Sequence, residues 1–416
     1  MFRLTNPQMR YDWGSVALLP ELLGTPGDGR PLAEIWMGAH PSAPSRISLD
    51  GRQVGLDEFV TSRPEQALGA DLGRGPGAHL PFLLKLLAAD RPLSLQVHPT
   101  REQAAAGFRA EDAAGIAPDD PSRNYRDSEH KPEMLYALTP FELMAGFRPV
   151  PVIRELLAGL RIDDLAPLLA GLDRASPAEA DGTPAADAGR PAETESALRS
   201  ALTALLTAAP QDQRRIVEAV VASARTRSAE RVEYARVGDL ARDYPGDVAI
   251  VASLFLNYLH LVPGDAVFVG AGMIHSYVRG LGVELMATSD NVLRAGLTAK
   301  HVDTRELLHL VDFAPGEPAR LDPVAVGGGA RRYTPPVEDF ALWVLAPELA
   351  EDGGPAVTVP GPPSGARIAL CCAGLASVTS ASEHLELRPG QAAFIPAGDG
   401  PIDVSASGTV VVACQP

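Results

Sequence analysis

The sequence predicts a mainly β protein with an α-helical segment inserted into its first half. Short apolar runs broken by Gly and Pro fill residues 1 to about 150 and resume from about 248, which is typical of strands. Apolar residues recur at helical spacing between about 151 and 247. A pattern that opens with Pro-Gly occurs twice, from Pro263 and from Pro389. At 416 residues the chain exceeds the usual size of one core, so we expect two or three domains.

The inserted segment has two kinds of sequence. The runs 152–160, 196–206 and 214–221 place apolar residues on one face of a helix. Residues from about 174 to 195 are rich in Ala, Pro, Gly and Asp and poor in large apolar side chains, so they cannot build a core. We therefore expect a helical insertion over 151–247 that contains a mobile loop at about 174–195.

The repeated pattern indicates how the β part is organised. Residues 263–275 align without a gap on residues 389–401, matching at Pro, Gly, Ala, Phe, Ala and Gly. Both copies resemble the second motif of the cupin jelly roll, in which a Pro-Gly turn starts a strand and a second glycine turn presents a metal-binding histidine. Pro401 stands where His275 stands in the first copy. We therefore predict two cupin-like jelly-roll units, with metal bound only in the first.

Polar side chains on one face of an apolar strand predict where that metal lies. In residues 92–99, Ser94, Gln96 and His98 point one way because side chains alternate along a strand. A buried Gln and His would cost stability without partners, and a cation would satisfy both. His98 alone is more simply a core histidine. Together with Glu133 and His275, however, Gln96 and His98 form an N2O2 set that suits zinc with room for substrate.

Further polar residues lie near these candidates in the sequence. If residues 129–133 are extended, Lys131 shares a face with Glu133, and His130 turns away as either a partner of a ligand or a surface residue. Glu284, between two apolar residues, is costly unless paired, so it is either an acid/base or a salt-bridge partner. Tyr277 has the same alternation parity as His275, and either lines the same pocket or packs as a core aromatic.

Composition limits the class of protein. The net charge of −16 argues against non-specific nucleic-acid binding, so an anionic substrate needs a local cluster of cations. The first residues lack the apolar core of a signal peptide, and no run of about 18 apolar residues suggests a membrane span. Cys371, Cys372 and Cys414 are interpreted as core residues of a reducing cytoplasm, where we expect the protein to be located.

Five sequence blocks can be compared with a known family. The blocks are Tyr11–Ser15, Ala33–Pro41, Leu80–Lys85 leading into Gln96–His98, His130–Glu133, and Ser289–Lys300. They cover most of the first 150 residues and roughly 250 to 305. In this order they resemble the type I phosphomannose isomerases, zinc enzymes that interconvert mannose 6-phosphate and fructose 6-phosphate.

The resemblance implies a set of roles. One zinc ion per chain would be held by the four metal candidates. Arg294 would stabilise the enediolate, and Lys300 would contact the anionic sugar phosphate. Alternation adds Ser94, Lys131 and Tyr277 as further substrate-binding candidates, because they share faces with the metal candidates. Lys131 and Glu284 both remain candidates for the proton-transfer base. The expected partner is a sugar phosphate, with no nucleic acid and no membrane, and we expect a monomer.

Three units follow from this interpretation: a catalytic unit of 1–150 with 248–310, the helical insertion, and a C-terminal cupin-like unit of 311–416 without metal. Two other functions stay open. An Fe(II) cupin oxygenase needs only two histidines and a carboxylate, but Gln96 as a fourth ligand argues against it. A non-catalytic sugar-phosphate-binding cupin is disfavoured because Lys131, Arg294 and Lys300 are all present.

Overall fold

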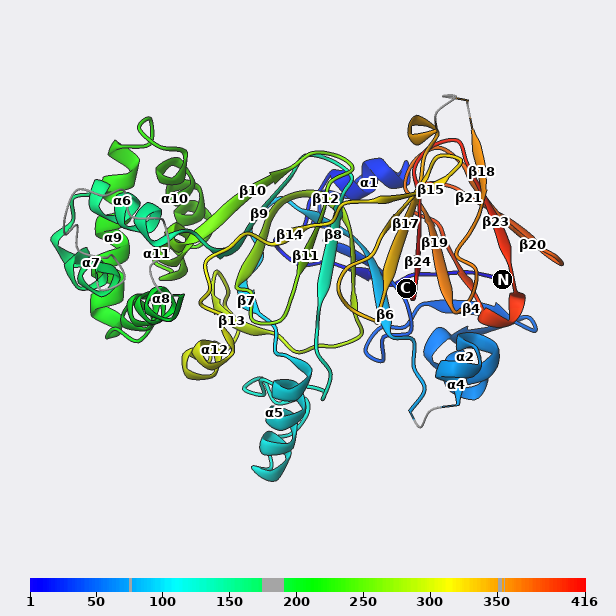
Figure 1. The fold of residues 1–416 in the computed structure, drawn as a ribbon, viewed down its shortest axis with the longest axis horizontal. Coiled ribbons are helices and arrows are strands. Elements are labelled where there is room, and N and C mark those ends of the chain that lie inside the picture. The colour runs from blue at the N-terminus through cyan, green and yellow to red at the C-terminus, as the bar shows by residue number, and fades with distance from the viewer. Residues whose placement is uncertain (75–76, 174–190, 351–353, 355) are drawn as a thin grey trace.

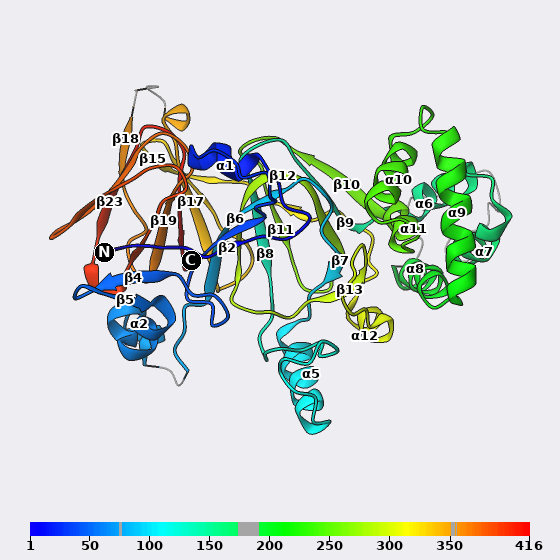
Figure 2. The ribbon, with the colours of Figure 1, turned by 180° about the vertical axis from the view of Figure 1, so that it is seen from behind.

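A computed structural model describes residues 1–74, 77–173, 191–350, 354 and 356–416 (Figure 1). A group of helices lies at one end, strands of the C-terminal part lie at the other, and the first β unit lies between them; Figure 2 shows the same order from behind. The predicted fold class, mainly β with a helical insertion, is confirmed. Most of the loop predicted at about 174–195 lies outside the described residues.

The first β unit is built on one large antiparallel sheet. Its centre is β12, which pairs with β6, β7, β8 and β9. Long central strands of this kind can bring side chains from distant parts of the sequence to one face. The strands are β2 (Gln8–Met9), β3 (Glu34–Met37), β6 (Phe82–Ala89), β7 (Leu95–Val97), β8 (Glu133–Ala137), β9 (Phe141–Phe147), β10 (Leu256–Leu261), β11 (Ala266–Val269), β12 (His275–Ala287), β13 (Leu293–Gly296) and β14 (Ala319–Arg320).

The second β unit consists of a seven-stranded and a four-stranded sheet. The repeat seen in the sequence is present here: β11 begins at Ala266 and β22 at Ala392, the same distance after Pro263 and Pro389. The glycine after each proline has a positive φ, 97° at Gly264 and 78° at Gly390. The strands are β1 (Phe2–Arg3), β15 (Val324–Gly327), β16 (Ala330–Tyr333), β17 (Ala341–Leu345), β18 (Val357–Pro360), β19 (Arg367–Cys371), β20 (Ala376–Ser380), β21 (His384–Leu387), β22 (Ala392–Ile395), β23 (Ile402–Ala406) and β24 (Val410–Cys414).

The two β units share a hydrophobic core. Leu84 of β6 and Val283 of β12 belong to the same buried cluster as Leu342 of β17 and Phe394 of β22. β1 (Phe2–Arg3) also pairs with β22, so the first residues join the C-terminal sheet, although we placed residues 1–150 in the first unit. The division of the chain at about 150, 248 and 310 therefore remains a proposal.

The helical insertion follows β9 and returns to the sheet at β10. Its buried residues, such as Leu202 and Val237, form one cluster with Leu95 and Val97 of β7. Packing of the helices thus supports the strand that precedes His98. The helices are α6 (Val150–Gly159), α7 (Ala166–Asp173), α8 (Pro191–Leu206), α9 (Pro210–Thr226), α10 (Val232–Asp243) and α11 (Ala249–Ala252).

The remaining helices are attached to the β units. Thr100 caps the N-terminus of α5 with a capping box, in which the side chains of Thr100 and Gln103 accept from each other's backbone N–H groups. Among the described residues, no helix combines the length and apolar character needed to cross a membrane. The bounds are α1 (Leu18–Leu23), α2 (Leu56–Ser62), α3 (Pro64–Leu68), α4 (Ala70–Gly73), α5 (Arg101–Ala113) and α12 (Thr304–Leu310), with a short hairpin of β4 (Arg46–Leu49) and β5 (Arg52–Gly55).

Candidate metal centre

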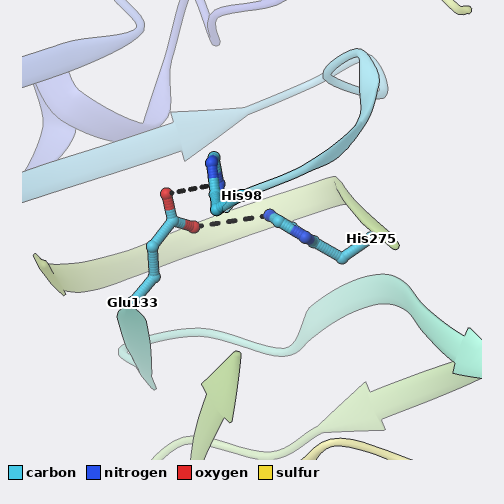
Figure 3. A group of neighbouring side chains, drawn as sticks. All are labelled: His98, Glu133 and His275. Carbon is cyan, nitrogen blue, oxygen red and sulfur yellow. Dashed lines mark ion pairs between the residues drawn. The ribbon is translucent and has the colours of Figure 1, made fainter. Parts of the chain in front are cut away.

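Three of the predicted metal ligands meet in the first β unit (Figure 3). His98 directly follows β7, Glu133 begins β8 and His275 begins β12. Their ligand atoms all lie within 4.8 Å of one another. All three side chains are buried, at no more than 1% exposure. The sheet therefore brings together three groups that the sequence separates widely, as predicted.

Both histidines present a lone pair to the carboxylate of Glu133. Nδ1 of His98 donates to the carbonyl of Asn291 at 2.7 Å, and Nδ1 of His275 donates to the carbonyl of Met273 at 3.0 Å. Each Nε2 then faces an oxygen of Glu133, at 3.1 Å for His98 and 3.4 Å for His275. Burial, assisted by the charge of Lys131, lowers the pKa of His98 to about 4, so this ring is neutral.

This arrangement fits a metal ion. Nε2 of His98 is buried and has no hydrogen-bond partner among the described residues. Its nearest polar neighbour is a carboxylate oxygen, which is also an acceptor, so the two atoms repel unless a cation lies between them. Neutral imidazole nitrogens and a carboxylate are ordinary zinc ligands, and hydrogen bonds at Nδ1 commonly orient such histidines.

Gln96 lies beside the three ligands. It is directly opposite His275 of β12 and Arg294 of β13, so the three side chains share one face of the sheet. Its amide nitrogen lies 3.3 Å from Nε2 of His275, while its Oε1 accepts a hydrogen bond from Ser94 at 3.1 Å. Rotating the amide by about 180° exchanges O and N, so Gln96 can also direct its oxygen at an ion and donate to Ser94.

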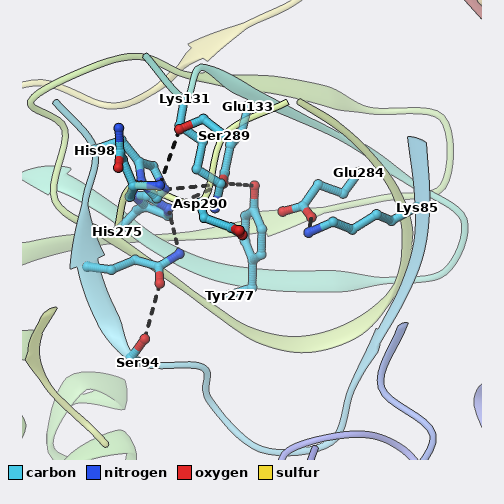
Figure 4. A network of polar contacts seen from close by, with 12 residues as sticks. Lys85, Ser94, His98, Lys131, Glu133, His275, Tyr277, Glu284, Ser289 and Asp290 are labelled. Carbon is cyan, nitrogen blue, oxygen red and sulfur yellow. Dashed lines mark hydrogen bonds and ion pairs between the residues drawn. The ribbon is translucent and has the colours of Figure 1, made fainter. Parts of the chain in front are cut away.

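Lys131 and Tyr277 both contact Glu133 (Figure 4). Nζ of Lys131 lies 2.9 Å from Oε1, and the Tyr277 hydroxyl donates to Oε2 at 3.3 Å. Burial acts to raise the pKa of Glu133, but the ammonium of Lys131 holds that pKa well below its usual range. Residues 130–132 are not part of a strand, contrary to our expectation, yet the long Lys131 side chain still reaches the carboxylate.

His130 contacts the second β unit and not the candidate ligands. Its Nε2 lies 3.0 Å from a carboxylate oxygen of Asp339, which precedes β17 in the second β unit. Arg101 at the start of α5 contacts both His130 and Asp339. His130 therefore takes part in a polar contact between the two β units.

Glu284 is a salt-bridge partner within a buried ionic group. Lys85 lies directly opposite it on β6, and the Lys85 Nζ is 2.8 Å from Glu284 and 3.5 Å from Glu34. Glu34 also accepts the indole N–H of Trp36 at 2.8 Å. Burial raises the pKa of Glu284 against the pull of Lys85. In Figure 4, Tyr277 lies between this pair and the histidines. Lys85 was not among the predicted site residues. A charged residue inside the apolar run of 82–89 could have indicated a buried ion pair there.

Three cations gather near the same face. Arg294 lies on β13 beside Gln96, and burial and the charge of Arg126 lower its pKa. Burial, followed by the charges of Arg294 and Arg126, lowers the pKa of Lys300, whose ammonium lies 5.7 Å from the Tyr11 ring centroid. Mutual repulsion of this kind favours an anion between the cations. Arg126 was not among the predicted residues, because a single arginine in a loop gives no local signal.

The fold and the site together define the class of this protein, a cupin-like β protein with a buried His–Glu–His group. A family model, the catalytic domain of type I phosphomannose isomerase, matches residues 1–150. The mannose-6-phosphate isomerase of Salmonella typhimurium is 36% identical, and that of Escherichia coli 35%, each over 98% of both chains. A crystal structure of zinc-bound mannose 6-phosphate isomerase, 33% identical, has a TM-score of 0.84 and covers 100% of this chain and 99% of that one. The chain belongs to the type I phosphomannose isomerase family.

Proposed function

We propose that this protein interconverts mannose 6-phosphate and fructose 6-phosphate with one zinc ion per chain, held by Gln96, His98, Glu133 and His275. The observation that carries the proposal is the buried carboxylate of Glu133 with a histidine nitrogen 3.1 Å from one oxygen and 3.4 Å from the other, because a cation between these groups would be bound by all three. The names of the relatives indicate the reaction, and the zinc-bound neighbour indicates the metal. The site would use nitrogen and oxygen ligands throughout.

Zinc with three neutral ligands and one carboxylate keeps a net positive charge, which would stabilise the negative charge that develops on the sugar oxygens as an enediolate forms. The chain's own residues would place the sugar beside it. Ser94 and Tyr277 adjoin the ligands, because their hydroxyl groups donate to Gln96 and Glu133. Each hydroxyl oxygen would accept a hydrogen bond from a sugar hydroxyl. Arg294, beside Gln96, would bind the enediolate oxygen.

The phosphate would be bound by Lys300, supported by Arg126. These side chains are close enough to affect one another's ionisation, and they offset the overall negative charge of the chain locally. A sugar phosphate could thus lie with its phosphate at the cations and its first two carbons near the metal ligands. Phosphate binding far from the reacting carbons would also make unphosphorylated mannose a poor substrate.

Proton transfer between C1 and C2 would be carried out by Lys131 or Glu284. Lys131 is favoured by position, since its ammonium contacts the ligand Glu133 directly. Glu284 is favoured by its raised pKa, which makes a carboxylate a better base, but Lys85 already occupies one of its oxygens.

The test is a coupled assay for fructose 6-phosphate combined with turnover in heavy water. Proton transfer through an enediolate predicts deuterium at C1 of fructose 6-phosphate or C2 of mannose 6-phosphate. Lys131→Ala and Glu284→Gln are compared at full zinc content, and the variant that loses both turnover and exchange carried the proton. Absence of isomerisation by zinc-loaded protein would refute the function and leave a binding protein. Tightly held iron with oxygen-dependent turnover would favour the oxygenase instead.

A further inference from the structure

The turn between β12 and β13 contains a buried residue that the proposed reaction does not use. Asn291 is 0% exposed, and its side chain bonds the segment 126–129, which leads to Lys131 and Glu133. Its Oδ1 accepts from the backbone N–H groups of Arg126 at 2.7 Å and Asp127 at 3.3 Å. Its Nδ2 donates to the carbonyls of Asp127 and Glu129, both at 2.8 Å, and to Oδ1 of Asp127 at 3.1 Å.

The main chain of Asn291 acts on a different element. Its carbonyl accepts the Nδ1–H of His98 at 2.7 Å, the hydrogen bond that turns Nε2 of His98 toward Glu133. A single residue therefore bonds both the histidine that follows β7 and the segment that enters β8. β13, which carries Arg294, begins only two residues further on.

Neighbouring side chains hold this turn in place. The Ser289 hydroxyl donates to Oδ1 of Asp127 at 2.8 Å and accepts the backbone N–H of Asn291 at 3.2 Å. Oδ2 of Asp127 accepts the backbone N–H of Asp290 at 2.8 Å (Ser289 and Asp290 are labelled in Figure 4). Because these bonds fix the turn against the segment 126–129, displacement of the Asn291 side chain would also displace the carbonyl that orients His98.

We propose that Asn291 is a positioning residue that couples the orientation of His98 to the placement of Lys131 and Glu133. This inference rests on the proposed metal function, because its consequence is the affinity for zinc. Groups that orient metal ligands typically change metal affinity or activity by about 10- to 100-fold when removed. Asn291 would act through two of the four proposed ligands at once, without touching the ion.

The test variant is Asn291→Asp. A carboxylate can still accept from the two backbone N–H groups, but it cannot donate to the two carbonyls, and it would face the carboxylate of Asp127. We expect the zinc Kd, measured by competition with a chromophoric chelator, to rise about 10- to 100-fold. Hydrogen exchange in the metal-free variant should accelerate at the amides of 126–129.

Asn257→Asp is the matched control. Asn257 is also buried, and its Nδ2 donates to the carbonyls of Phe147 at 3.1 Å and Gly316 at 2.8 Å and, at 3.3–3.4 Å, to those of Gly146 and Ala145. Its side chain bonds none of the four proposed ligands. The Asn257→Asp variant should have a lower denaturation midpoint and an unchanged zinc Kd. Equal weakening of zinc binding by both variants, or an unchanged Kd in Asn291→Asp, would show that Asn291 only stabilises the fold.

A second variant covers the case in which Asn291→Asp does not fold. Ser289→Ala removes two supports of the same turn, and we expect the zinc Kd to rise by a smaller factor, about 3- to 10-fold. No change would overturn the inference. Failure of the unmodified protein to bind zinc would instead refute the proposed function, so the two failures are distinguishable.

Discussion

Acidification should destabilise the metal-free protein through His98. The ring is buried and neutral, with a pKa of about 4 against an ordinary value of 6.5. Between these values the unfolded chain binds a proton that the folded chain excludes, so stability falls as pH falls from 6.5 toward 4. The difference of about 2.5 pKa units at about 1.4 kcal/mol each corresponds to roughly 3 kcal/mol.

The assay compares urea unfolding of wild type and His98→Gln, both in excess chelator, from pH 7.5 to pH 4. The variant lacks the titrating ring, so the difference in unfolding free energy between the two proteins isolates its contribution. That difference should change by roughly 3 kcal/mol across the range, with wild type losing stability more steeply. His384→Gln, at an exposed position on β21, is the matched control and should follow wild type.

A flat difference, within about 1 kcal/mol between pH 7 and pH 4, would refute the reasoning. It would mean that His98 takes up a proton in the folded protein and forms an ion pair with Glu133 at 3.1 Å. The facing lone pairs, on which the fit to a metal depends, would then not exist.

Three further predictions concern individual side chains. Lys85→Met should lower the unfolding free energy by about 3–5 kcal/mol, because Glu284 and Glu34 lose their buried counterion. A shift of the urea midpoint equivalent to less than about 1 kcal/mol would contradict this prediction. Arg294→Ala should lower mainly kcat and Lys300→Ala should raise mainly KM; steady-state kinetics in which both change only KM would make Arg294 a binding residue. Glu133→Ala should lose zinc on dialysis and lose activity, whereas full zinc by elemental analysis would remove Glu133 from the ligand set.

The sequence by itself determined the local elements and the ligand candidates. Periodicity located α6, α8 and α9 of the insertion but not α7, α10 and α11. Helical and strand spacing can be recognised in this way because they are properties of neighbouring residues. His98, Glu133 and His275 could be selected because polar side chains inside apolar strands need partners, and the structure brings them within 4.8 Å. The Pro-Gly repeat located β11 and β22, since a glycine with positive φ leaves a recognisable signature.

Only the tertiary structure decided which distant groups become partners. Lys85 lies opposite Glu284 because β6 and β12 pair in one register, and a shift by one residue would turn either side chain to the other face. In the sequence, Asn291 could not be distinguished from an ordinary turn residue. Its proposed positioning role depends on two other segments that lie within hydrogen-bond distance only in the folded chain. Pairing of β1 with β22 likewise depends on which sheet edge is free after folding. Such contacts follow from strand register and packing, which are not properties of any short stretch of sequence.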